Sequence, residues 1–254
     1  MKQAKERIAC LTAYDASFAQ LLEKSGVNVV LVGDSLGMVI QGCDTTLPVS
    51  VDDMLYHTQC VAKGLSKALL ITDMPFLSFT TVEEAVLNAG LFMKRGGAHM
   101  VKLEGGVDQA ETVSALNKNG IPVCAHLGLQ PQYVHKIGGY RVQGRDAEAA
   151  DKMLVDALTL QQAGADLMLL ECVPEILARK ITEALDIPVI GMGASVNCDG
   201  HILVLYYIFD ISLGIKPKFS KNFMTSANSI EEAIQQYVSA VKKAEFPTAE
   251  HVFS

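Results

Sequence analysis

Residues 27–35 read Val-Asn-Val-Val-Leu-Val-Gly-Asp-Ser, an apolar run that ends in a glycine and two polar side chains. The run is short, rich in valine and barely alternates between apolar and polar residues, which is typical of a strand buried on both faces. Seven similar runs are spread along the chain, and together they predict a parallel sheet covered by helices. The expected strands are Ile8–Thr12, Val27–Val32, Ala68–Thr72, Met100–Leu103, Ile121–Ala125, Asp166–Leu170, Ile187–Ile190 and Ile202–Leu205.

Stretches with helical periodicity separate these strands, except in the seventh unit, which has room for only a short turn. Such an alternation allows a closed barrel or an open doubly wound sheet. The length of 254 residues and the number of strands favour the barrel. We therefore expect an α/β fold, a (β/α)8 TIM barrel, with residues 1–254 forming a single domain. The expected helices begin at Val82, Ala150 and Ile230 or cover Ala16–Lys24, Val51–Gly64, Val107–Lys118 and Pro174–Leu185.

The overall composition argues against several classes of protein. The formal net charge is −7 and no segment concentrates Lys or Arg, so we expect neither nucleic acid nor a membrane surface as a partner. The longest apolar run, Ile202–Phe209, is far shorter than the roughly 20 residues that cross a bilayer. None of the six cysteines forms a C-x-x-C pair, which indicates reduced thiols in a cytoplasmic protein.

Acidic residues follow several of the expected strands. They are Asp34, Asp73, Glu104 and Glu171, and in a parallel barrel all such strand ends meet at one rim, where the chemistry usually lies. Each of them alone can instead cap a helix or make a turn. Together they form a cluster in which two carboxylates about 5 Å apart repel by roughly 3 kcal/mol at an effective dielectric near 20. Such a cluster requires a cation, a shared proton or a basic neighbour.

A set of oxygen ligands favours a hard cation, Mg2+ before Mn2+ or Ca2+. Zinc is disfavoured, because His126 is the only histidine expected at this rim on a strand end and no Cys/His spacing fits a zinc site. A magnesium ion binds one or two carboxylates and leaves positions for substrate oxygens. The keto and carboxylate oxygens of a 2-oxo acid can fill two of those positions.

The residues at this rim stand in longer runs that closely resemble the ketopantoate hydroxymethyltransferase (3-methyl-2-oxobutanoate hydroxymethyltransferase) family. The resemblance extends over nearly the whole chain, with the runs in the same order. The runs are Val32–Met38, Gln41-Gly42 with Thr46–Val49, Asp73–Phe76, Met100–Gly106, His126–Gln132, Gly138–Arg145 and Leu170–Pro174.

The resemblance implies transfer of a hydroxymethyl group from methylenetetrahydrofolate to 3-methyl-2-oxobutanoate, which gives 2-dehydropantoate in pantothenate biosynthesis. It implies that Asp34 and Asp73 bind Mg2+ and that Glu104 joins the metal shell through water. It also implies that Ser35 and Lys102 hold the oxo acid, together with the metal-binding aspartates. Members of the family are magnesium enzymes of the cytoplasm, usually decamers, so a homodecamer is expected.

The resemblance further implies that Glu171 is the catalytic proton acceptor, and the residues before it agree. Carbon–carbon bond formation requires C3 of the oxo acid to lose a proton, and a carboxylate accepts a proton better at neutral pH when a dry pocket raises its pKa. Glu171 follows the apolar run Leu167–Leu170. His126 either forms a hydrogen bond with the substrate, orients a neighbour, or is a structural histidine. Segment Gly138–Arg145 is either a lid over the pocket or a solvated loop.

The chain departs from the family pattern near strands seven and eight. Ser195 stands where the family usually has a glycine, and Tyr207 and Asp210 stand where it often has Asp and Gly. Two other functions stay open. One is a 2-oxo acid lyase or aldolase of the isocitrate-lyase type, which would share the metal site and need no folate. The other is a non-catalytic assembly protein built on a barrel.

Overall fold

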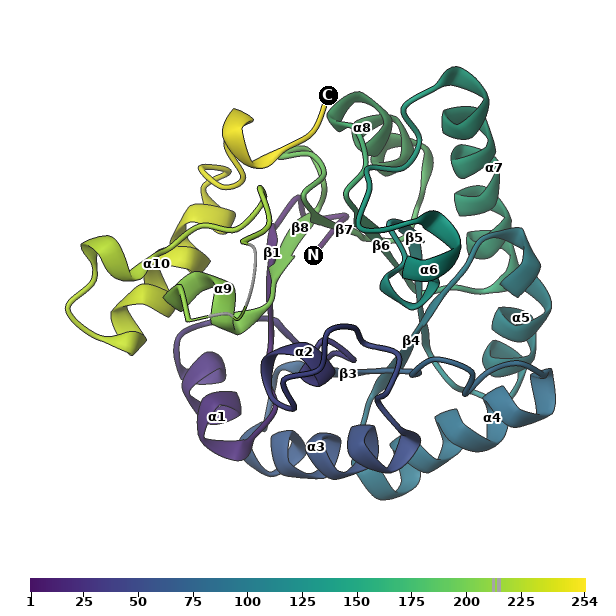
Figure 1. Cartoon of the computed structure of the whole chain (residues 1–254), viewed down its shortest axis with the longest axis horizontal. Coiled ribbons are helices and arrows are strands. Elements are labelled where there is room, and N and C mark those ends of the chain that lie inside the picture. Colours follow the sequence, from purple (N-terminus) through teal and green to yellow (C-terminus); the bar gives the residue numbers. More distant parts are fainter. Residues whose placement is uncertain (212, 214–215) are drawn as a thin grey trace.

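Eight parallel strands follow one another in chain order around a closed barrel (Figure 1). The structure is a computed structural model, and it describes residues 1–211, 213 and 216–254. Strand β8 closes the barrel by pairing with β1, with Ile8 opposite Gly200 and Leu11 opposite Leu203. This confirms the (β/α)8 barrel over the open sheet. The strands are β1 (Ile8–Thr12), β2 (Val29–Val32), β3 (Leu69–Asp73), β4 (Met100–Glu104), β5 (Val123–Gly128), β6 (Leu167–Glu171), β7 (Val189–Met192) and β8 (Gly200–Leu203).

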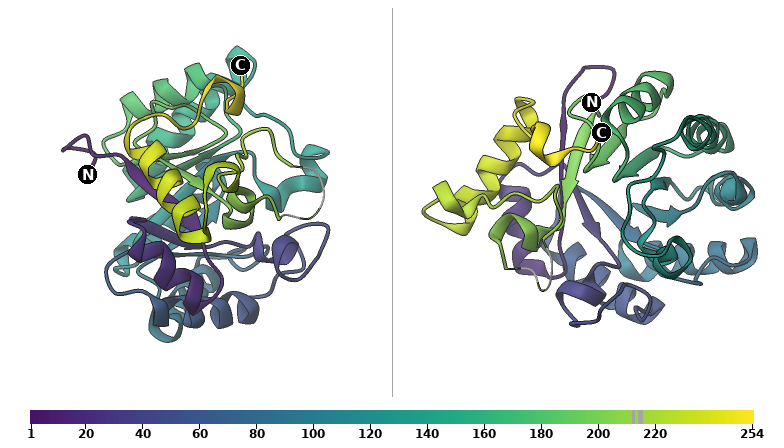
Figure 2. Two further views of the ribbon diagram at one scale, coloured as in Figure 1. Left: turned by 90° about the vertical axis from the view of Figure 1, so that its left-hand side faces the viewer. Right: turned by 45° about the horizontal axis from the view of Figure 1, so that its top comes forward.

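The long helices form a ring around the outside of the barrel, as the views in Figures 1 and 2 show. Residues 92–96 extend α4 as a π-helix, residues 107–109 form a 3₁₀ turn before α5, and residues 193–199 connect β7 to β8 by turns, as expected. Among the described residues, no helix is long and apolar enough to span a membrane. The ring consists of α1 (Ala16–Lys24), α3 (Val51–Gly64), α4 (Val82–Leu91), α5 (Ala110–Lys118), α7 (Ala147–Ala163), α8 (Glu175–Ala184) and α10 (Ile230–Lys242).

Three shorter helices lie in the connections that follow strands, where the sequence predicted loops or strand. They are α2 (Leu36–Val39), α6 (Val134–Ile137) and α9 (Leu205–Phe209). Helices of four or five residues are too short to show a periodic pattern. The expected last strand, Ile202–Leu205, was therefore placed too late: β8 ends at Leu203, and Leu205 already begins α9.

The barrel has two apolar layers, which alternate along each strand. One set of side chains fills the interior, including Leu31, Ile71, Leu169 and Ile202. The other set faces outward and packs beneath the helices. Both layers are buried, which explains why the strand sequences scarcely alternate. The interior set continues towards the carboxyl end of each strand, and that continuation positions the candidate site.

Candidate active site

The strands end at a cavity of about 900 Å³, and all seven site residues predicted from the sequence line it. Five of them continue the interior face of a strand: Ile71 is followed by Asp73, Met100 by Lys102 and Glu104, Cys124 by His126, and Leu169 by Glu171. Because side chains two residues apart share a face of a strand, the barrel interior changes from apolar to ionisable at its carboxyl end. Asp34 and Ser35 reach the cavity from the turn after β2.

A buried ion pair lies at the ends of β3 and β4. Lys102 Nζ is 2.5 Å from Asp73 Oδ1, and the two residues are direct partners across the sheet. The other oxygen, Asp73 Oδ2, accepts a hydrogen bond of 3.1 Å from the backbone N–H of Asp34. Burial opposes the charge on Lys102, but the carboxylates of Asp73, Glu104 and Asp34 outweigh it and raise the pKa of Lys102. Lys102 is therefore a permanent cation, suited to hold a substrate carboxylate.

Three carboxyl groups of the cavity are difficult to ionise. Burial, reinforced by the charges of Asp73 and Glu104, raises the pKa of Asp34. Burial also raises the pKa of Glu104 to about 8, against the opposing charge of Lys102. The pKa of Glu171 lies well above its usual value, first because of burial and then because of Glu104. A single lysine does not balance this cluster, so a further positive charge would stabilise it.

His126 lies between two of these carboxyl groups. Its Nδ1 is 3.5 Å from Glu104 Oε1, and its Nε2 is 3.5 Å from Glu171 Oε2. Burial, followed by the charge of Lys102, lowers the pKa of His126 well below its usual value, so the ring is neutral and these contacts are not ion pairs. Both ring nitrogens and Glu104 Oε1 are buried without a hydrogen-bond partner among the described residues. Such orphaned atoms are rare and point to a missing ligand or water.

The donor set fits a hard cation, although it does not form a closed cage. Among the described residues, no group of three or more His, Cys, Asp or Glu side chains is arranged as a metal site, so Asp34, Asp73 and Glu104 are neighbours in one cavity without forming a three-ligand group. Magnesium needs only one or two carboxylates and keeps several waters. The raised pKa values and the unpaired Glu104 oxygen are the observations that fit this ion.

Two residues that the sequence analysis gave no role contact the predicted ones. Tyr14 is buried, and its hydroxyl lies 2.9 Å from Ser35 Oγ. Gln132, in the connection after β5, donates from its backbone N–H to Glu104 and from its side chain to Asp34. Tyr14 precedes α1 and Gln132 lies in a 3₁₀ turn, so no strand end marked either residue in the sequence.

The departures near strands seven and eight have different consequences. Ser195 is fully buried, and its hydroxyl accepts hydrogen bonds from the backbone and side chain of Asn197 outside the cavity lining. Tyr207 lines the cavity, so its ring forms part of the wall. Asp210 caps α9 with φ +62° and pairs with Lys216. Glycine adopts this left-handed conformation most readily, and Asp is one of the few other residues that adopt it.

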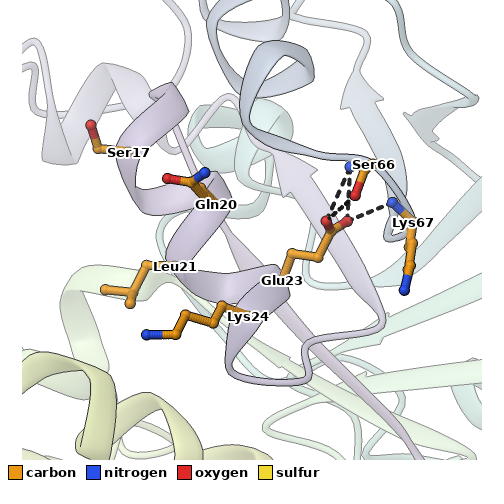
Figure 3. A pocket seen from close by; sticks show the side chains of 7 residues that line it. All are labelled: Ser17, Gln20, Leu21, Glu23, Lys24, Ser66 and Lys67. Atoms are coloured by element: carbon orange, nitrogen blue, oxygen red, sulfur yellow. Dashed lines mark hydrogen bonds between the residues drawn. The ribbon is translucent and has the colours of Figure 1, made fainter.

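A second cavity, of about 760 Å³, lies on the outer surface between α1 and the segment before β3 (Figure 3). Its carboxylate, Glu23, accepts hydrogen bonds from the backbone of Ser66, Lys67 and Ala68 and from the Ser66 hydroxyl. These bonds join two elements and occupy the carboxylate, so this cavity has a structural role. Of the two cavities, the one at the strand ends combines burial with unpaired ionisable groups among the described residues.

A closed parallel barrel with a buried acidic cavity at its strand ends defines the class of this protein, a (β/α)8-barrel enzyme. Solved structures agree at the level of the fold. A putative phosphonomutase from Burkholderia cenocepacia has a TM-score of 0.65 at 16% identity, covering 82% of this chain and 92% of that chain. A phosphonopyruvate hydrolase in complex with oxalate and Mg++ has a TM-score of 0.61 at 12% identity, covering 96% and 95%.

The chain belongs to the ketopantoate hydroxymethyltransferase family, whose model matches residues 1–249. The 3-methyl-2-oxobutanoate hydroxymethyltransferase of Alkalilimnicola ehrlichii is 57% identical over 253 residues, covering 100% of this chain and 91% of that protein. The enzyme of the same name from Nitrosococcus oceani is 57% identical over 250 residues, covering 98% and 95%. The resemblance seen in the sequence runs is therefore confirmed as membership of the family.

Proposed function

We propose that this enzyme transfers a hydroxymethyl group from methylenetetrahydrofolate to 3-methyl-2-oxobutanoate and so forms 2-dehydropantoate for pantothenate biosynthesis. Membership of the family supports the reaction. The observation that carries the proposal is the convergence of four buried carboxyl groups and one buried lysine in a single cavity. A magnesium ion bound here would act as a Lewis acid that stabilises negative charge developing on the oxo acid.

The proposed roles follow from the position of each side chain. Asp34 and Asp73 would hold the cation, with Glu104 behind a water. Lys102, already cationic beside Asp73, would hold the substrate carboxylate with Ser35, whose hydroxyl is oriented by Tyr14. His126 is neutral and buried between Glu104 and Glu171, so it would orient these carboxyl groups or donate to the substrate.

Glu171 is the proposed general base, which takes the proton from C3 of the oxo acid. The carbanion electrons then form the new bond to the one-carbon unit of the folate. Both bonds from that carbon to the folate nitrogens break, a water molecule supplies the hydroxyl group, and the two nitrogens take up the protons released from C3 and from the water. Glu171 lies on the interior face at the end of β6 and is 6% exposed. Its raised pKa brings a carboxyl group closer to the value at which it exchanges protons at neutral pH.

The size and lining of the cavity support a second, larger substrate. At about 900 Å³, it has the size of sites that hold drug-sized ligands. The buried ionisable residues are gathered at the strand ends, whereas Tyr140, Tyr207, Phe219 and Phe253 line the cavity from the connections and the C-terminus. We propose that the oxo acid occupies the ionisable part and the folate the aromatic part.

A turnover assay with 3-methyl-2-oxobutanoate and methylenetetrahydrofolate tests the reaction. Exchange of the C3 proton for deuterium, with and without folate, tests the first step alone. No exchange and no turnover at any magnesium concentration would contradict the proposal. The lyase alternative has only the fold in its favour: a 2,3-dimethylmalate lyase of the isocitrate lyase superfamily has a TM-score of 0.61 at 13% identity.

The homodecamer, the single-domain organisation over residues 1–254 and the cytoplasmic location are likewise proposals. The decamer rests on the family resemblance, and sedimentation of the purified protein would measure its mass. The cytoplasmic location is supported by the six cysteines, all of which are free thiols.

A further inference from the structure

Gln132 is a buried side chain that joins the ends of three strands. It lies in the connection between β5 and α6 and is 4% exposed. Its Nε2 donates to Asp34 Oδ2 at 2.8 Å and to the backbone carbonyl of Met74 at 3.0 Å. Its backbone N–H donates to Glu104 Oε2 at 3.1 Å. One residue thus fixes one oxygen on each of two carboxyl groups of the cavity.

The hydrogen-bond network determines how the amide of Gln132 is oriented. Asp34 Oδ2 and the Met74 carbonyl are both acceptors, so the group that faces them must be the NH2 group, which has two hydrogens to donate. The opposite orientation would place three acceptors together. The carbonyl oxygen Oε1 therefore points away from them, and it is buried with no hydrogen-bond partner among the described residues.

We infer that Gln132 is a positioning residue for the cation site. It holds Asp34 and Glu104 by one oxygen each, so that the remaining oxygens face the cavity. Gln132 is not itself part of the cavity lining among the described residues, so it acts on the site through Asp34 and Glu104. This inference rests on the proposed function, since it assumes that a divalent cation binds beside Asp34. It assigns a role to a residue outside the predicted site.

Residues of this kind set the direction and basicity of a ligand without contacting the metal, and their loss costs about 10- to 100-fold in metal affinity. Gln132→Met keeps the length of the side chain and removes both the donor and Oε1. Gln132→Ala removes the same groups and also leaves a cavity. Both variants retain the backbone N–H that reaches Glu104.

The test measures the binding of Mn2+, the probe, to the full-length protein. The electron paramagnetic resonance signal of the free ion reports how much Mn2+ remains unbound. Both variants should bind Mn2+ about 10- to 100-fold more weakly than the wild type. Gln130→Met is the matched control, because it makes the same change two residues earlier in the same connection. Gln130 is half-buried, and among the described residues its side chain has no hydrogen bond to Asp34 or Glu104, so the affinity should stay unchanged. Thermal unfolding of each metal-free variant shows that it is folded.

Three results would overturn the inference, and they separate it from the proposed function. Wild-type affinity in both variants would mean that Gln132 does not position the site, with the metal proposal intact. Loss of affinity in Gln132→Ala but not in Gln132→Met would show that packing, not hydrogen bonding, matters. No Mn2+ binding by the wild type would contradict the metal proposal itself and this inference with it.

Discussion

At the scale of single residues, the buried pair of Lys102 and Asp73 decides how the metal site can be tested. The two side chains are 5% and 3% exposed. Removing one partner of a buried pair costs about 3–5 kcal/mol, because the other charge is left without compensation. Asp73→Ala would therefore combine loss of a ligand with loss of stability. Asp73→Asn is the better test, because it keeps a hydrogen-bond acceptor in place while Glu104 and Asp34 remain to balance the charge of Lys102.

Asp73→Asn should nearly abolish activity while the protein stays folded. The amide oxygen can still accept a hydrogen bond from Lys102 or from the backbone N–H of Asp34, but the negative charge that attracts the cation is gone. Without the cation, the negative charge that develops on the oxo acid loses several kcal/mol of stabilisation, which corresponds to about a 10³-fold slower reaction. Steady-state turnover and thermal unfolding measure the two effects, and turnover at the wild-type rate would refute the metal assignment.

Glu171→Gln should bind the oxo acid but lose exchange of its C3 proton. The amide has the same shape and cannot accept the proton, and a positioned general base contributes about 10²- to 10⁴-fold to the rate. Proton NMR in deuterated water follows the exchange, and calorimetry measures oxo-acid binding. Glu183→Gln, an exposed position on α8, is the matched control. Normal exchange in Glu171→Gln would mean that another residue is the base.

Magnesium affinity should rise with pH between about pH 6 and pH 9. Asp34 and Glu104 have raised pKa values in the metal-free protein, about 8 for Glu104, so at lower pH they hold protons that compete with the cation. Each displaced proton changes the affinity by about tenfold per pH unit below its pKa. Calorimetry in buffers of different ionisation enthalpy counts the protons released. A pH-independent affinity would contradict cation binding at these carboxyl groups.

At the scale of elements, most strands and helices could be predicted because apolar runs and helical periods are strong local signals. The exact strand limits were less predictable: only the first strand, Ile8–Thr12, has both limits as expected, and the other seven differ at one or both ends. The expected strand from Ile121 contains Pro122, which has no N–H to donate, and β5 begins only after this proline, at Val123. The strand β8 begins at Gly200, where an added Cβ would lie 2.3 Å from the carbonyl oxygen of Ile8. This requirement comes from the neighbouring strand and is invisible in the local sequence.

The candidate site likewise contains residues that local sequence signals predict and residues that they do not. Asp73, Lys102 and Glu171 lie in or directly after apolar runs, so a parallel sheet places them at one rim. Gln132 could not be found in this way, because it lies in a connection and its partners are 28 to 98 residues away. Only the closed barrel brings these segments together.

Glu23 should stabilise the junction between α1 and the segment before β3. Glu23→Ala removes the acceptor for the backbone N–H groups of Ser66 and Lys67 (Figure 3) and for that of Ala68. Since this site is partly open to water, a cost of about 1 kcal/mol in the free energy of unfolding is expected. Denaturant titration measures it, with Glu183→Ala, an exposed position on α8, as the control.

The contribution of Glu23 should also depend on pH. Burial is the largest single influence and raises its pKa, but the hydrogen bonds from Ser66, Ala68 and Lys67 together outweigh it and lower the pKa from 4.5 to about 2. A depressed folded-state pKa gives stability that is present above the unfolded value and is lost as pH falls from 4.5 towards 2. The difference between wild type and Glu23→Ala should therefore be full at pH 7 and shrink at pH 3. A constant difference would show that the carboxylate charge is not responsible.

At the scale of the whole molecule, distant segments form the mouth of one cavity. Tyr140, after β5, donates to Met38 Sδ, after β2, over 3.7 Å. Phe253, near the C-terminus, and Phe219 pack against Gly193, where an added Cβ would lie 3.0 Å and 2.8 Å from the two rings. Lys218 lies over the Phe253 ring and donates to the carbonyl of Val252 at 2.6 Å. The far end of the chain is thereby fixed at the cavity, beside the residue that follows β7.

The proposed division of the cavity into an oxo-acid part and a folate part leads to a prediction. A mutation at the mouth of the cavity should weaken binding of the folate without affecting the reaction of the oxo acid. Phe253→Ala removes an aromatic wall, and loss of stacking worth about 1 kcal/mol should raise the KM for methylenetetrahydrofolate roughly fivefold to tenfold. Exchange at C3 of the oxo acid without folate should stay at the wild-type rate, because Glu171 and Lys102 are untouched. Phe76→Ala, at a position 38% exposed outside the cavity lining of the described residues, controls for the loss of a phenyl group. If Phe253→Ala slows the exchange and leaves the folate KM unchanged, the aromatic part of the cavity does not hold the folate, and the two substrates must share the ionisable end.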